Sequence, residues 1–130
     1  MADSDRMACA MPHPLPASRD EQVLLLLFRR MAACGLNDAR ASLLALDQFG
    51  TGFLRTLHLT RAFLHGLARF TDGPITIAPC CAPRMTRHEH LIVSAMANAC
   101  PIALLELAGP HGYAGLRSLA QALQAELADQ

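Results

Sequence analysis

The stretch from residue 53 to residue 70 constrains the fold most, because its apolar residues recur at helical spacing. At about 100° per residue, one face carries apolar side chains, namely Phe53, Leu57, Leu64 and Leu67, with Phe63 and Phe70 at its flank. The opposite face carries basic side chains, namely Arg55, His58, Arg61, His65 and Arg69. The pattern predicts an amphipathic helix whose apolar face contributes to a core.

Local signals predict two helices before this stretch. Ser18 and Glu21 form an S-x-x-E capping box, in which the two side chains satisfy free N–H groups of a first helical turn. We therefore expect a helix over about residues 19–34, which Gly35 ends. A second and shorter helix is expected from Asn37 or Asp38 to near residue 49, before the break at Gly50-Thr51-Gly52.

Similar signals predict the helices that follow. Thr86 and Glu89 form a second capping box, T-x-x-E, at the start of a helix. Pro101 interrupts or restarts that helix, because proline fits the first turn of a helix and not its interior. A short helical segment over residues 102–107 and a last helix over about 113–128 are expected around the break at Gly109-Pro110.

These elements predict an all-α fold, a small bundle of about five helices with a short extended connection that contains cysteines. The 130 residues suffice for one domain with its own core. Residues 1–17 contain three prolines among small and polar residues, which is typical of a flexible tail. We expect residues 18–130 to form a single helical domain.

Composition excludes several classes of protein. The formal net charge is +0, which argues against a protein that binds nucleic acid through bulk electrostatics. The apolar run at residues 23–28 is far shorter than the ~20 residues of a membrane-spanning helix, and no signal peptide is recognisable at the N-terminus. The 5 cysteines do not resemble a secreted disulfide framework, and all the basic residues other than histidine are arginine. We expect a bacterial protein from a reducing cytoplasm.

The chemically most unusual stretch is Pro79-Cys80-Cys81-Ala82-Pro83-Arg84. Its two adjacent thiols lie between prolines, which fix the backbone. A capped helix follows directly, and Arg84 and Arg87 are near in sequence; helix N-termini and cations both stabilise thiolates. The stretch predicts a binding or reactive site at Cys80 and Cys81. The alternative is that both cysteines are small buried apolar residues.

Two chemical alternatives involve a histidine. Zinc is bound by thiolates and imidazoles, which Cys80, Cys81 and His88 could supply. Two observations count against a zinc site: His90 would point ~200° away from His88 on a helix, and the chain has no C-x-x-C or H-E-x-x-H motif. We predict no cofactor and keep zinc as the alternative. Cys81 and His88 are also candidates for a nucleophile and its base. The motifs of serine hydrolases, P-loop enzymes and dinucleotide-binding enzymes are missing from the sequence, so the balance favours a protein that is not an enzyme.

The basic face of the helix at residues 53–70 is a second candidate binding surface. Arg55, His58, Arg61 and His65 would present positive charge to a protein partner or an anionic ligand. His58 and His65 lie about 10 Å apart along a helix and cannot share one ion. The alternative is a solvated helix face with local ion pairs.

Two motifs together resemble a family of small uncharacterised alphaproteobacterial proteins, a domain of unknown function. One is Arg-Arg-Met-Ala at residues 29–32, and the other is Ala-Pro-Cys-Cys at residues 78–81 followed by Pro-Arg-Met-Thr at residues 83–86. The family has no assigned activity, so the resemblance implies no catalytic residues.

The sequence as a whole favours a small cytoplasmic binding or regulatory protein without enzymatic activity. Its binding residues would be Cys80, Cys81, Arg84 and Arg87, beside the basic face. A metal-binding or thiol-redox protein that uses Cys80 and Cys81 is the first alternative, and a cysteine-dependent enzyme is the second.

Overall fold

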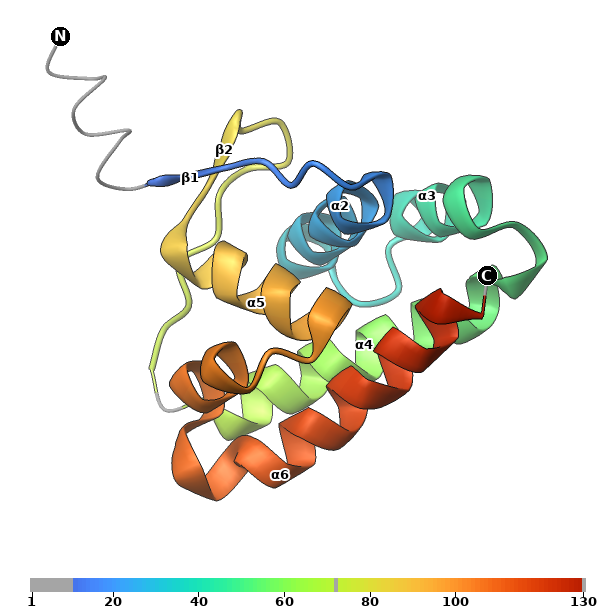
Figure 1. Cartoon of the computed structure of the whole chain (residues 1–130). Coiled ribbons are helices and arrows are strands. Elements are labelled where there is room, and N and C mark those ends of the chain that lie inside the picture. The colour runs from blue at the N-terminus through green and yellow to red at the C-terminus, as the bar shows by residue number, and fades with distance from the viewer. Residues whose placement is uncertain (1–10, 72, 130) are drawn as a thin grey trace, which may run out of the picture.

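The computed structural model describes residues 11–71 and 73–129, which fold mainly into helices (Figure 1). The helices are α2 (Arg19–Cys34), α3 (Ala39–Phe49), α4 (Phe53–Phe70), α5 (Arg87–Asn98) and α6 (Pro101–Ala128), with a 3-10 turn, η1 (Gly50–Gly52), between α3 and α4. Two strands of two residues each, β1 (His13–Pro14) and β2 (Arg84–Met85), pair antiparallel. The all-α prediction is confirmed.

Most helix ends follow the local sequence signals. α2 ends at Gly35, whose φ of 102° suits a residue without a side chain. The Asp38 carboxylate accepts a hydrogen bond from the Ala41 N–H (3.0 Å) at the start of α3. The capping box of Thr86 and Glu89 forms as predicted at the start of α5.

The capping box predicted at Ser18 is wrong. Ser18 lies at the N-cap position of α2, but its side chain makes no capping hydrogen bond. The start of α2 is tied to the preceding segment instead, because the Gln22 side chain donates to the Pro16 carbonyl (2.8 Å).

The core lies where α6 runs along α4 and where α5 packs against both α6 and α2 (Figure 1). Its fully buried apolar side chains come from all of these helices and include Leu24, Leu27, Leu57, Phe63, Ile92, Met96, Leu104, Leu116 and Leu123. α4 and α6 approach closely at Gly112, where an added Cβ would lie 2.8 Å from the Phe70 Cβ. Only a residue without a side chain fits this contact.

α6 is bent at Gly109, where a break was predicted. Gly109 has φ 70° and ψ 177°, which lie outside the helical range, and Pro110 begins the second part of the helix. In the described part of the chain, no single helix is long and apolar enough to cross a membrane; α5 and α6 meet these criteria only as a pair, which is bent by 104° at its break.

The segment before α2 lies against the connection between α4 and α5. Of the tail predicted over residues 1–17, residues 1–10 lie outside the described part, whereas His13 pairs with Met85 and Pro14 with Arg84. The Arg84 side chain strengthens the pairing, since its Nε donates to the Met11 carbonyl (2.9 Å) and its Nη2 to the Pro12 carbonyl (2.8 Å). We call residues 11–16 the N-terminal strap.

Candidate functional site

A buried ion pair between α2 and α5 organises the region around the cysteines. Arg29 is 1% exposed and Glu89 is 0% exposed. The guanidinium donates twice to the carboxylate, from Nε to Oε2 (2.6 Å) and from Nη2 to Oε1 (3.0 Å). Such a bidentate pair is strong and geometrically specific.

The same two side chains hold the backbone on both sides of the cysteines. Arg29 donates to the carbonyls of Ala82 (3.1 Å) and Arg84 (2.8 Å). Glu89 accepts from the N–H groups of Thr86 (2.9 Å) and Ala78 (3.3 Å). Four backbone groups of the connection therefore depend on one ion pair, which fixes the path of residues 78–86.

Cys80 and Cys81 lie at the tip of the turn that this network holds. The turn spans residues 79–82, and the Ala82 N–H donates to the Pro79 carbonyl (3.1 Å), so the cysteines occupy its two central positions. Both thiols are free; Cys80 is half-buried and Cys81 is exposed. We call residues 79–82 the cysteine turn. The predicted alternative of two buried apolar cysteines does not describe it.

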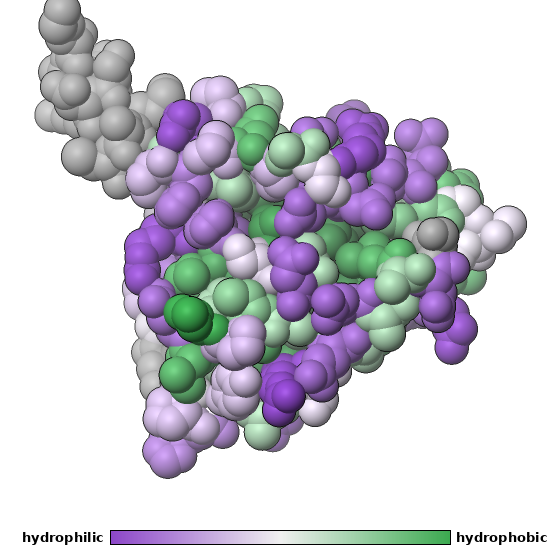
Figure 2. Space-filling view, in the orientation of Figure 1, coloured by the Kyte–Doolittle hydropathy of each residue, from purple (hydrophilic) through white to green (hydrophobic). Residues whose placement is uncertain are grey.

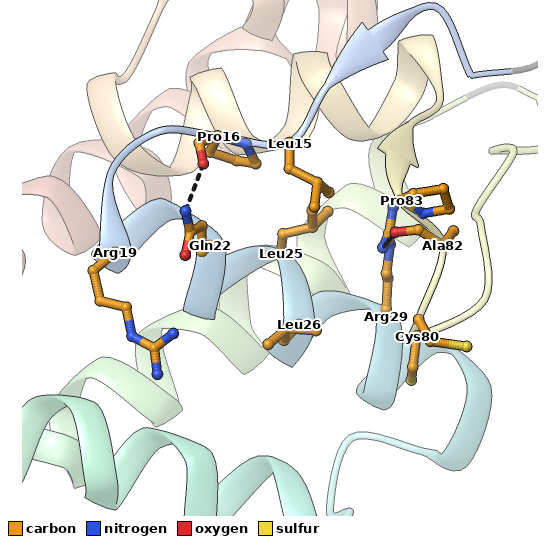
Figure 3. A pocket seen from close by; sticks show the side chains of 11 residues that line it. Leu15, Pro16, Arg19, Gln22, Leu25, Leu26, Arg29, Cys80, Ala82 and Pro83 are labelled. Carbon is orange, nitrogen blue, oxygen red and sulfur yellow. Dashed lines mark hydrogen bonds between the residues drawn. The ribbon is translucent and has the colours of Figure 1, made fainter. Parts of the chain in front are cut away.

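One cavity lies between the cysteine turn, α2 and the N-terminal strap (Figure 3). We call it the strap cavity; its volume is about 310 Å³. Its walls are mainly apolar and are formed by Leu15, Pro16, Leu25, Leu26, Ala82 and Pro83, with Arg19, Gln22, Arg29 and the two cysteines. Figure 3 shows Arg19 at the end opposite Cys80.

A second hollow opens on the α3 side of the cysteine turn. We call it the Cys80 hollow; it measures about 530 Å³ and is lined by Arg30, Arg40, Leu43, Leu44, Asp47 and Cys80. Arg30 forms an ion pair with Asp38 (3.0 Å). This hydrogen-bonded contact raises the pKa of Arg30, as do the nearby side chains of Cys34 and Cys80, and it holds the pKa of Asp38 below its usual value. The Cys80 hollow is therefore lined by a cation as well as by the thiol of Cys80.

His13 of the N-terminal strap stacks on His90 of α5. The rings of His13 and His90 lie with centroids 3.9 Å apart and planes 7° from parallel. Burial lowers the pKa of His13, and the neighbouring charges of His90, Arg84 and Arg87 lower it further. The arrangement favours a neutral His13.

The predicted binding residues near the cysteines have other partners. Arg84 holds the strap, as described above, and Arg87 forms an ion pair with Glu106 of α6. The cation beside a thiol is instead Arg30, which the sequence analysis did not select. Its position one residue after the buried Arg29, four residues before Cys34, gave no indication of a contact with Cys80.

His88 lies on another side of the connection from the cysteine turn. Its Nδ1 accepts a hydrogen bond from the Thr76 N–H (2.9 Å), and its ring lines a cavity of about 250 Å³ with residues of α6. Within residues 11–71 and 73–129, no hydrogen bond or shared cavity joins His88 to Cys80 or Cys81. The same ranges contain no group of three His, Cys, Asp or Glu side chains placed to hold a metal ion.

The basic face of α4 is separate from the cysteine turn. Arg55 lies 3.9 Å from the Glu126 carboxylate of α6, and the Arg61 Nε donates to the Leu36 carbonyl (2.7 Å). His58 is exposed, and His65 borders an apolar cavity with Ile75 and Ile77. Two arginines of this face, Arg55 and Arg61, therefore have local partners.

Apolar side chains also remain on the surface. Figure 2 shows a group of them over the first turns of α6, where Ile102 is 72% exposed and Leu105 is 49% exposed. Nothing among the described residues indicates a partner for this group.

The sequence analysis missed Arg29, which the geometry makes the central residue of the site. One signal was available, because Arg29 follows Leu25 by one helical turn on the apolar face of α2. A charge at such a position requires a buried partner. Glu89 was identified only as a capping residue, which is half of its role.

Comparison with known proteins gives one match. Residues 1–129 match the model of a family of unknown function, DUF6628. No curated protein and no solved structure shows a significant match. The resemblance to an uncharacterised family is thereby confirmed at the level of a domain of unknown function, and the chain belongs to the DUF6628 family.

Proposed function

We propose that this chain is a small cytoplasmic binding protein, without catalytic activity of its own, that takes a small apolar anion into the strap cavity. The observation that carries the proposal is an apolar cavity with one end marked by an arginine and its walls fixed by the buried ion pair. A volume of about 310 Å³ is near the lower end of the range for small-molecule sites. A small ligand fits it better than a large one.

The charges around the cavity favour an anion. The positive charge of Arg29 is compensated by Glu89. Arg19 donates to the neutral side chain of Gln48 (3.2 Å), and in the described part of the chain it has no acidic ion-pair partner. A carboxylate at this end would gain a charge-assisted hydrogen bond, while an apolar tail would lie along Leu25 and Leu26.

Thermal unfolding with three probes of one chain length tests the proposal: octanoate, octylamine and octanol. A ligand that binds only the folded state stabilises it by about 2.7 kcal/mol at a hundredfold excess over its dissociation constant. We expect octanoate to raise the melting temperature more than octylamine or octanol. Equal shifts for octanoate and octylamine would contradict the anion site.

Two variants locate the binding. Leu26→Trp fills the cavity from a half-buried position, and Arg19→Gln removes its cation; each should reduce the octanoate shift. Arg69→Gln is the matched control, because it removes an exposed arginine on α4. If Leu26→Trp binds octanoate as the native chain does, the ligand lies elsewhere.

A further inference from the structure

We propose that Cys80 and Cys81 form a thiol–disulfide exchange pair whose substrate is a small anionic disulfide bound in the Cys80 hollow. This inference does not depend on the ligand proposed for the strap cavity, which lies on the other side of the turn. It rests on three features: the adjacency of the thiols, their unequal exposure and the charges of the hollow.

The adjacency of the cysteines favours a reversible disulfide. Neighbouring Cα atoms are about 3.8 Å apart, which is shorter than the usual separation across a disulfide, about 4.4–6.8 Å. A bond between such neighbours is strained, and strained disulfides are readily reduced. Its formation also needs no movement of distant segments, since both cysteines occupy one turn.

The two thiols have different surroundings. Cys80 is half-buried and borders three hollows of the surface, whereas Cys81 is exposed. Arg30 and Cys80 line the same hollow, which places a cation near the sulfur that attacks. We therefore assign the first attack to Cys80 and the second to Cys81.

The Cys80 hollow selects the charge of the substrate. Its charged lining residues are Arg30, Arg40 and Asp47, and its apolar ones are Leu43 and Leu44. Because Arg30 is already paired with Asp38, the guanidinium of Arg40 and the carboxylate of Asp47 are the charges that complement a molecule with carboxylates and an ammonium group. Oxidised glutathione has this composition, and it serves as the probe.

The exchange proceeds in two balanced steps. The Cys80 sulfur loses its proton to water and attacks one sulfur of the small disulfide. A disulfide bond forms between Cys80 and that sulfur, and the original S–S bond breaks. One small thiol leaves with a proton from solvent. The Cys81 sulfur then loses its proton and attacks the Cys80 sulfur. The Cys80–Cys81 bond forms, the bond between Cys80 and the small molecule breaks, and the second small thiol leaves with a proton from solvent. Two protein thiols are oxidised, and one disulfide is reduced to two thiols.

Mass spectrometry of the full chain tests both steps. The reduced protein is mixed with oxidised glutathione, quenched with an alkylating reagent at increasing times and digested with trypsin. Cleavage after Arg69 and Arg84 isolates both thiols in one peptide that contains no other cysteine. We expect a transient glutathionyl adduct on Cys80, located by fragmentation, followed by a peptide that takes up no alkyl group and is two hydrogens lighter than the unalkylated reduced peptide.

Variants check the order of the steps and the role of charge. Cys81→Ser should accumulate the Cys80 adduct, and Cys80→Ser should react several-fold more slowly. Arg40→Gln should slow the reaction with oxidised glutathione but not with cystamine, which is a cationic disulfide. Arg69→Gln is the control; it removes one cleavage site, so its two thiols lie in the longer tryptic peptide 62–84, which contains no other cysteine. The proposal is overturned if the native peptide stays reduced, if it carries two adducts, or if the first adduct forms on Cys81. The native time course decides these points even if a variant fails to fold.

Discussion

Replacing Arg29 by methionine tests whether the buried ion pair holds the cysteine turn. The substitution keeps a long apolar side chain in α2 but leaves the Glu89 carboxyl group at 0% exposure without its guanidinium partner, with the N–H groups of Thr86 and Ala78 as its remaining partners. Removing one partner of a buried pair costs about 3–5 kcal/mol. That is a large part of the stability of a domain, which is about 5–15 kcal/mol.

The double variant distinguishes this network from an ordinary buried ion pair. Replacing both partners of such a pair by apolar residues is often neutral. Here, Arg29→Met/Glu89→Leu also removes the acceptor of two buried N–H groups, at about 1–3 kcal/mol each. We therefore expect the double variant to remain destabilised by about 2–6 kcal/mol.

Urea unfolding followed by far-UV circular dichroism measures both effects, since the chain is helical and has no tryptophan. An unfolding entropy of about 2.1 cal/mol/K per residue converts the loss for Arg29→Met into a fall of roughly 11–18 °C in melting temperature. Arg87→Met is the matched control; it breaks an exposed pair with Glu106, which is worth about 0–1 kcal/mol. A cost below about 1 kcal/mol for Arg29→Met, or native stability of the double variant, would refute the reasoning about buried charges.

Two further predictions concern the strap and the core. The pKa of His13 is lowered in the docked strap, so the released strap binds a proton more readily, and docking should weaken as the pH falls below about 6.5. Histidine NMR titration and amide exchange of His13 and Met85 measure this weakening. A His13 titration midpoint at or above that of an unfolded peptide would contradict it. Gly112→Ala places a Cβ 2.8 Å from the Phe70 Cβ, so overpacking should lower the free energy of unfolding by about 1–3 kcal/mol despite the better helix propensity of alanine. Urea unfolding measures this change, with Ser118→Ala as the exposed control. An unchanged unfolding curve would show that α4 and α6 can move apart.

The helices could be predicted because their signals are local. Gly35, Asp38 and the capping box of Thr86 and Glu89 each act within one turn of a helix end, and all of them have the predicted role. The helix at residues 53–70 follows from a periodicity that its own side chains carry. The failure at Ser18 is instructive, since the same S-x-x-E pattern is present there but the start of α2 is tied to Pro16.

The candidate site could be predicted only in part, because its contacts join distant residues. Cys80 and Cys81 stand out in the sequence, but Arg29 lies 60 positions before Glu89. The pairing of the strap joins positions that are 70 and 72 residues apart. No periodicity or spacing reports such contacts, and the partners assumed from short distances in the sequence, Arg84 and Arg87, bind elsewhere.

The two motifs singled out in the sequence, at residues 29–32 and 78–86, meet in space at the ion pair. Arg29 begins the first motif, and the second leads through the cysteine turn to the helix that carries Glu89. Apolar side chains alone could hold α2 against α5, so the cohesion of the helices does not require buried charges. What apolar side chains cannot supply is a partner for the backbone groups at residues 78, 82, 84 and 86. The distinctive contribution of the ion pair is therefore the fixed conformation of the turn that presents Cys80 and Cys81, and the chemistry of this chain should be sought at those two thiols.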